Sequence, residues 1–148
     1  MWSAIGNHDA DHGQRAYYDL FSFPREAEAG GVPSGTEAYY SFDYDNIHFV
    51  SLDSVDHPDS PGMQEWLVRD LIAARENSNT DWMIVFVHHA PYTKGAHDSD
   101  DPKEFDDRIR KIRRHFVPIF DEYGVEIIDA EPPMLLVKTM DPGLAAIR

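Results

Sequence analysis

The chain has 148 residues and a formal charge of −14, from 13 lysines and arginines against 27 aspartates and glutamates. This length suits one domain, and an apolar content of 42% excludes a disordered chain. The acidic balance argues against binding to nucleic acid or to anionic membranes, and no apolar run approaches the roughly 20 residues of a membrane span. Because the sequence has no cysteine, it excludes disulfides, thiolate metal ligands and a cysteine nucleophile.

The first part of the chain reads as a short strand, an aromatic segment and a loop. Trp2–Ile5 is predicted as an apolar strand that Gly6 ends. Residues 12–24 are rich in aromatic side chains and stop at Pro24. The glycines and prolines of residues 26–35 predict a loop.

A β-hairpin is predicted next. Tyr39–Tyr44 and Ile47–Asp53 are β-rich runs joined at Asp45-Asn46, which has turn chemistry. In the second run His48 alternates with apolar neighbours and is expected to face solvent. The aromatic side chains of the hairpin are expected to pack in the core and across the strands, namely Tyr39, Tyr40, Phe42, Tyr44 and Phe49.

The second half alternates helices and strands. Ser60-Pro61 is typical of a helix start, because an N-cap residue precedes proline at the first helical position. Apolar residues then follow at helical spacing: Met63, Trp66, Leu67, Leu71 and Ala74. The unbroken apolar run Trp82–Val87 predicts a strand covered on both faces. Asp101-Pro102 predicts a second helix, which Gly124 closes before an apolar strand at Val125–Ile128. The inner face of that helix is expected to comprise Phe105, Ile109, Ile112 and Phe116.

This order of elements predicts βαβ units, and therefore an α/β fold with a partly parallel sheet. In such sheets, polar groups at the carboxyl ends of strands form the site. Two clusters occupy such positions: GNHD at residues 6–9, after the first strand, and His88-His89, after the strand 82–87.

The GNHD cluster has the chemistry of an acid–base and metal site. Asn7 offers a neutral carbonyl oxygen, a suitable ligand for a divalent metal. His8 followed by Asp9 is a usual acid–base pairing, in which the carboxylate orients the ring and the imidazolium protonates a leaving oxygen. A simple polar turn is the alternative interpretation, since all three residue types are common in turns.

The histidine pair lies where a strand would hold a metal ligand rigidly. Adjacent histidines point to opposite faces if the strand continues, so we expect only one of them to bind a metal. The alternative is a pair of histidines that caps a strand end without binding anything.

Together these segments carry a family resemblance. GNHD, then GTEAYYSFDYDNIHFVSLDS at 35–54 and WMIVFVHHAPY at 82–92, resemble the calcineurin-like metallophosphoesterases, with the purple-acid-phosphatase-like branch as the closest likeness. The resemblance implies a partial metallophosphoesterase sandwich, with mixed sheet layers flanked by helices. It also implies a dinuclear centre of Fe, Zn or Mn and hydrolysis of phosphate esters by metal-bound hydroxide.

The resemblance assigns roles residue by residue. Asn7 and His88 match two ligands of one metal, and we prefer His88 to His89 because it directly follows the apolar run. His8 matches the histidine that contacts phosphate and protonates the leaving group, with Asp9 as its orienting partner. His89 is then a substrate-binding or supporting residue beside the metal ligands. His97 falls about where some purple acid phosphatases place a substrate-contacting histidine.

Other family motifs have no counterpart here. The family places Asp-x-His and Gly-Asp-x-x-Asp before GNHD, and Gly-His-x-His after the strand that 124–128 resembles. The chain is therefore expected to be the central part of a larger domain, incomplete at both ends, with a partial phosphoesterase domain at 1–128 and an unmatched tail at 129–148. Asp129 or Glu131 could substitute as ligands. Because two ligands rarely hold a metal tightly, we expect at most one partial site, weak binding and little turnover.

The functional prediction is a metal-dependent phosphoesterase that is impaired as this chain, acting on a small phosphate ester or a phosphoprotein. The alternatives are a non-catalytic scaffold or interaction module and, with less support, a phosphotransfer enzyme that uses a phosphohistidine. No nucleic-acid or membrane partner is expected. The resemblance implies a secreted or periplasmic protein, although no signal peptide is visible. Unpaired apolar strand edges, such as that of Trp82–Val87, predict self-association.

Overall fold

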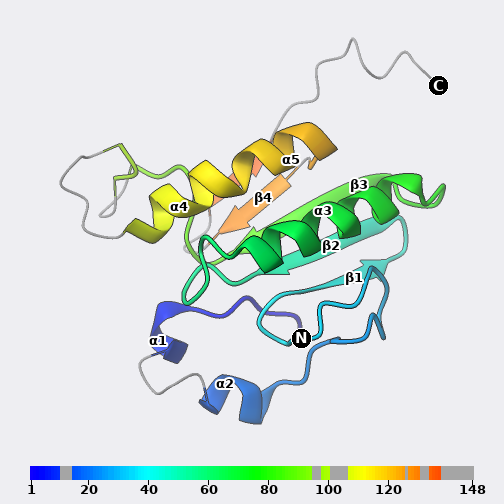
Figure 1. Cartoon of the computed structure of the whole chain (residues 1–148), viewed down its shortest axis with the longest axis horizontal. Helices are drawn as coiled ribbons and strands as arrows, with labels where there is room; N and C mark the ends of the chain where they lie inside the picture. The colour runs from blue at the N-terminus through cyan, green and yellow to red at the C-terminus, as the bar shows by residue number, and fades with distance from the viewer. Residues whose placement is uncertain (11–14, 95–97, 101–106, 126, 131–133, 138–148) are drawn as a thin grey trace.

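The computed structural model describes residues 1–10, 15–94, 98–100, 107–125, 127–130 and 134–137, of which 10, 15, 127–130 and 134–137 are described by their backbone alone. A single mixed sheet organises them, with strand order β1-β2-β3-β4-β5 (Figure 1). The strands are β1 (Tyr40–Tyr44), β2 (Ile47–Leu52), β3 (Trp82–Val87), β4 (Ile127–Ala130) and β5 (Met134–Val137). The three central strands β2, β3 and β4 are parallel, while β1 and β5 pair antiparallel at the two edges.

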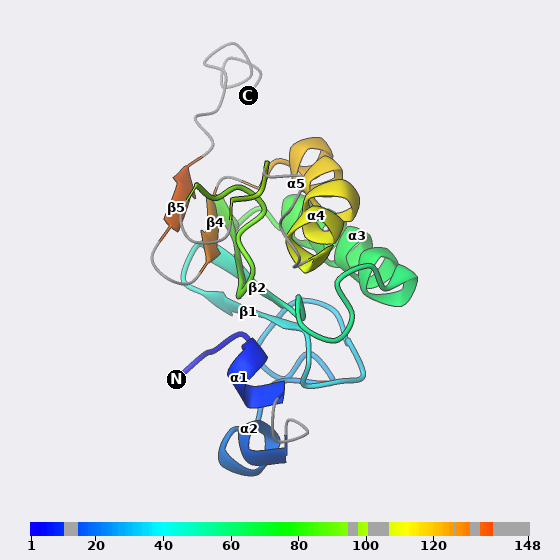
Figure 2. The same cartoon turned by 90° about the vertical axis from the view of Figure 1, so that its left-hand side faces the viewer.

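Helices cover one face of this sheet. Figures 1 and 2 show α3 (Pro61–Glu76), α4 (Asp107–His115) and α5 (Val117–Tyr123) on that side, and the short α1 (Asn7–Ala10) and α2 (Arg15–Leu20) below the sheet. The predicted start of α3 is confirmed, because the Ser60 hydroxyl accepts a hydrogen bond from Met63 N–H and Pro61 follows it. Gly124 ends α5 in the left-handed conformation, as its position predicts.

Two apolar clusters lie on opposite faces of the sheet. The helix-side cluster includes the residues predicted for the inner face of α3, together with Val50, Leu52, Met83, Val85, Val87, Ile112, Phe116 and Phe120. The opposite cluster joins the N-terminal segment to the hairpin and comprises Ile5, Tyr17, Phe23, Tyr40, Phe42 and Val55. The hairpin itself is confirmed, with Tyr44 paired with Ile47 across Asp45-Asn46.

Several sequence predictions need correction. Trp2–Ile5 forms no strand; instead Ser3 O accepts hydrogen bonds from the hydroxyls of Tyr17 and Tyr40, and Ile5 is buried. Tyr44 does not pack in the core, because 73% of it is exposed.

The strand Trp82–Val87 also differs from its prediction. It alternates between buried residues on the helix side and half-buried or exposed ones opposite, so only one face is fully covered. It is also a central strand, paired with both β2 and β4, so the prediction that its edge is unpaired is wrong. Self-association therefore has no support from this strand. The start expected at Asp101-Pro102 and the inner-face residue Phe105 lie outside the described residues.

The prediction that His48 faces solvent is wrong, because only 1% of it is exposed. Alternation along β2 places it with Val50 and Leu52 on the face that α3 covers. There its Nδ1 lies 2.7 Å from Asp43 Oδ1 and its Nε2 lies 2.8 Å from Asp70 Oδ2. The expected alternation is present, but the face that carries His48 is the covered one.

Candidate functional site

The carboxyl ends of β2 and β3 lie side by side at one edge of the sheet. Leu52 pairs in parallel register with Val87, so Asp53-Ser54 and His88-His89 follow at neighbouring positions. The GNHD turn lies against this edge, because Asn7 contacts His88. The structure therefore brings the two predicted clusters together, although the segment before the first of them has no regular secondary structure and is not a strand.

Asn7 and His88 make the central contact. Asn7 Oδ1 accepts a hydrogen bond from His88 Nε2 at 2.8 Å, across 81 positions of sequence. Gly6 permits this approach, because a Cβ there would lie 3.3 Å from both His88 Nδ1 and Asp9 Oδ2. Donor atoms held about 2.1 Å from one metal ion lie roughly 3 Å apart. Once the ring proton has moved off Nε2, the amide oxygen and the ring nitrogen are placed, and chemically suited, to share one cation.

Asp9 shapes the turn that carries these residues. Its Oδ2 accepts a hydrogen bond from Gly6 N–H at 2.8 Å, and its own N–H donates to Gly6 O at 3.1 Å. These two bonds close the turn at the start of α1. His8, the expected proton donor, is exposed on α1. Its role and the ring-orienting role of Asp9 remain predictions.

His89 is buried, with 8% of it exposed. Its backbone N–H donates to Ser54 Oγ at 3.0 Å, and its Nδ1 lies 2.8 Å from the same oxygen. The rings of His88 and His89 meet edge to face with centroids 4.8 Å apart. His89 therefore supports the segment that carries His88. His97 and Glu131 lie outside the described residues. Asp129, in β4, is described only by its backbone, which pairs with Phe86 of β3.

Sequence reasoning missed Asp53 and Ser54, which are both buried at this edge. The Asp53 carboxylate accepts the N–H groups of Val55 and Asp56 and lies 2.9 Å from His57 Nδ1. A signal was present, since both residues follow a strand that runs parallel to the one before His88-His89.

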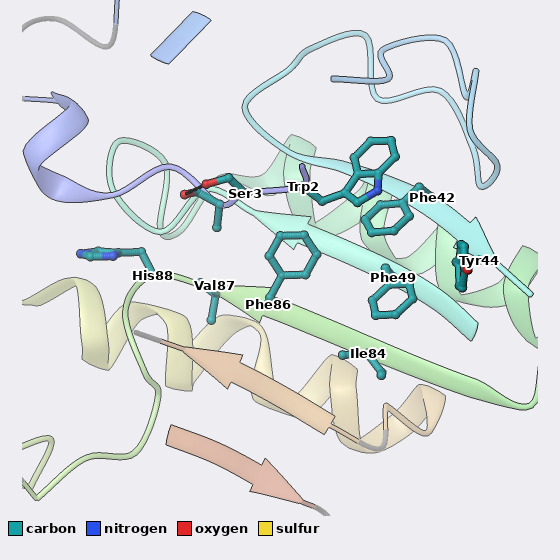
Figure 3. A pocket seen from close by; sticks show the side chains of 10 residues that line it. Trp2, Ser3, Phe42, Tyr44, Phe49, Ile84, Phe86, Val87 and His88 are labelled. Atoms are coloured by element: carbon teal, nitrogen blue, oxygen red, sulfur yellow. Dashed lines mark hydrogen bonds between the residues drawn. The ribbon is translucent and has the colours of Figure 1, made fainter. Parts of the chain in front are cut away.

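An open hollow of about 600 Å³ extends from His88 along the face of the sheet opposite α3. Figure 3 shows the aromatic rings of Trp2, Phe42, Phe49 and Phe86 around it, with His88 at one end. Trp2 and Phe42 stack with ring centroids 4.1 Å apart. Aromatic rings thus form much of the lining, and Ser3, Tyr44 and His88 supply polar groups (Figure 3).

Within the described ranges, no three histidine, cysteine or acidic side chains come together as a metal-binding group. None of the helices in the described part of the chain has the length and apolar character needed to cross a membrane. The candidate metal site therefore consists here of one amide oxygen and one imidazole nitrogen.

Comparison with known proteins defines the class. The profile of the calcineurin-like phosphoesterase family matches residues 1–128, and the chain belongs to this family. The uncharacterized protein Rv2577 of Mycobacterium tuberculosis H37Rv is 30% identical over 142 residues, which cover 84% of this chain and 25% of that protein. Purple acid phosphatase 15 of Arabidopsis thaliana is 34% identical over 93 residues, or 60% of this chain and 16% of that protein.

These matches confirm the family resemblance, and the second relative supports the purple-acid-phosphatase-like branch. The mixed α/β sheet with its helices is consistent with part of a metallophosphoesterase domain. The matched part of the chain covers 25% of the mycobacterial relative and 16% of the plant one. The match ends within β4, which continues to Ala130.

Proposed function

We propose that this chain contributes one half-site to a metal-dependent phosphoesterase, in which Asn7 and His88 bind one metal and His8 donates a proton. The observation that carries the proposal is the 2.8 Å contact between Asn7 Oδ1 and His88 Nε2. A bound Fe, Zn or Mn ion would polarise the phosphoryl group and offset the charge that develops during hydrolysis. The family membership supports phosphate esters as substrates, either small molecules or phosphoproteins.

The protein groups perform the remaining steps. His8 lies next to Asn7 on α1 and is exposed, so its ring can reach a bound ester and protonate the leaving oxygen. The Asp9 carboxylate accepts the Gly6 N–H and closes the turn, and this fixes the backbone positions of Asn7 and His8. The hollow beside His88 leaves this end of the sheet open to a ligand.

Two protein ligands bind a metal weakly, because tight sites use three or four. We therefore expect low metal affinity and little turnover from this chain alone. Both relatives are more than three times as long as this chain, and we infer that further ligands of the complete site come from parts of such a protein beyond these residues.

The test is hydrolysis of p-nitrophenyl phosphate with added Mn²⁺, Zn²⁺ or Fe²⁺. Wild type is compared with His8→Ala and His88→Ala, and with His115→Ala as a matched control at the end of α4. Metal-dependent activity that both site variants lose and the control keeps supports the proposal. Complete inactivity with every metal favours the non-catalytic alternative for this chain. A phosphohistidine at His88 or His89 would instead favour a phosphotransfer enzyme.

A further inference from the structure

We propose that Ser54 is a positioning residue of the site, which holds His89 in one tautomer and thereby fixes the segment that presents His88 to Asn7. Neither of the two clusters that define the site, GNHD and His88-His89, includes Ser54. The inference rests on the proposed metal role of Asn7 and His88, but its first test does not need a metal.

The hydrogen bonds around the Ser54 hydroxyl determine the tautomer. Ser54 is fully buried, and its Oγ accepts the backbone N–H of His89 at 3.0 Å. The hydroxyl proton then needs an acceptor, because a buried donor left without a partner costs about 1–3 kcal/mol. His89 Nδ1 lies 2.8 Å away and provides that acceptor. The proton of the His89 ring is therefore placed on Nε2.

This double contact reaches His88 through the strand ends. Leu52 and Val87 are register partners, so Ser54, just after β2, lies beside His89, just after β3, and contacts it. The ring of His89 stands edge to face against the ring of His88 at 4.8 Å. Because Ser54 binds both the backbone N–H and the ring Nδ1 of His89, the His89 ring stays in place and limits the rotation of the neighbouring His88 ring. His88 Nε2 is thereby kept toward Asn7.

Ser54 therefore acts on the proposed metal through two histidines without touching it. Groups that orient metal ligands in this way typically change metal affinity by about 10–100-fold when they are removed. Ser54→Ala is expected to weaken Mn²⁺ binding by about tenfold, and Ser54→Thr, which keeps the hydroxyl, to retain most of it.

The first experiment is long-range ¹H–¹⁵N NMR of the histidine rings in wild type, Ser54→Ala and Ser54→Thr. Ser51→Ala is the matched control, because Ser51 lies three residues earlier, within β2, and is equally buried but faces away from the helices. We expect wild type, Ser54→Thr and Ser51→Ala to carry the His89 proton on Nε2, and Ser54→Ala to show a mixture of tautomers. The second experiment measures Mn²⁺ affinity of the same four proteins by calorimetry.

A wild-type His89 ring protonated on Nδ1 overturns the proposal without any variant, as does an unchanged tautomer in Ser54→Ala. A loss of Mn²⁺ affinity that is equal in Ser54→Ala and Ser51→Ala also overturns it, because the effect would then be general. If wild type binds no Mn²⁺ while the tautomers behave as expected, the metal assignment fails and the Ser54–His89 contact stands. If Ser54→Ala does not fold, wild type and Ser54→Thr still decide the tautomer.

Discussion

Raising the pH should weaken the fold through His48. Both ring nitrogens of this buried residue face carboxylates, Asp70 on α3 and Asp43 on β1. Ionised carboxylates only accept hydrogen bonds, so a ring that satisfies both must carry two protons. Burial acts to lower the pKa of His48, but the hydrogen bonds and charges of Asp70 and Asp43 outweigh it and hold the pKa above its ordinary value.

The sign of the effect follows from that raised pKa. The contribution of His48 to the free energy of unfolding is fully present below its unfolded pKa of about 6.5, and is lost as the pH rises through the folded pKa. Between these two values the folded chain keeps a proton that the unfolded chain has released. The free energy of unfolding then falls by up to about 1.4 kcal/mol per pH unit from this group.

Replacing the His48 side chain should lower the free energy of unfolding by more than deprotonating its ring does. Asp70 is fully buried, and without His48 the donors left to it among the described residues are Val32 N–H and the Ser41 hydroxyl. Breaking a buried charged pair typically costs about 3–5 kcal/mol. Since two donors remain, we expect about 3 kcal/mol for His48→Gln at low pH.

The assay is urea unfolding from about pH 6 to about pH 9 for wild type, His48→Gln and the control His115→Gln. Wild type and the control should lose stability as the pH rises. His48→Gln should be less stable at low pH, and its difference from wild type should shrink toward high pH. A constant difference across the whole range would refute the reasoning.

Three further predictions follow from single contacts. Gly6→Ala should weaken metal binding severalfold by calorimetry, because the new Cβ would press on His88 Nδ1 and Asp9 Oδ2 at 3.3 Å. Ser60→Ala should lower the free energy of unfolding by about 1 kcal/mol, since it removes the N-cap of α3. Burial raises the pKa of Tyr40 to about 12. In a spectrophotometric titration, the ionisation step that wild type shows and Tyr40→Phe lacks should therefore fall well above the ordinary tyrosine range.

Each of these has a clear contrary result. Unchanged metal affinity in Gly6→Ala would show that the close approach at residue 6 is not needed by the site. An unchanged midpoint in Ser60→Ala would show that the cap does not stabilise α3. A Tyr40 that ionises near pH 10, the ordinary tyrosine value, would contradict its burial against the N-terminal segment.

Local patterns predicted the parts of the fold that depend on local chemistry. The turn at Asp45-Asn46 and the start of α3 at Ser60-Pro61 are set by neighbouring residues, and the structure confirms both. The parallel pairing of β2 with β3 followed from the strand–helix–strand order. Because that order brings strand ends to one edge, it also placed His88 near the predicted site.

The failures involve contacts between distant segments. Trp2–Ile5 has the composition of a strand, but tyrosine hydroxyls bind its backbone and no strand in the described part of the chain pairs with it. His48 alternates with apolar neighbours as a surface residue would, but it lies buried in contact with Asp70, 22 positions away on α3. Ser54 ends the segment 35–54 that resembles the family, but the sequence assigns it no role, and only the register of β2 with β3 reveals that it contacts His89.

The most direct test of the central claim is a Mn²⁺ titration followed through the histidine ring signals in NMR spectra of wild type, Asn7→Ala and His88→Ala. The paramagnetic ion broadens signals close to where it binds. We predict weak binding that broadens the His88 signals first, and a loss of that binding in both variants. Broadening that spares His88, or binding that survives both substitutions unchanged, would contradict a metal site formed by Asn7 and His88.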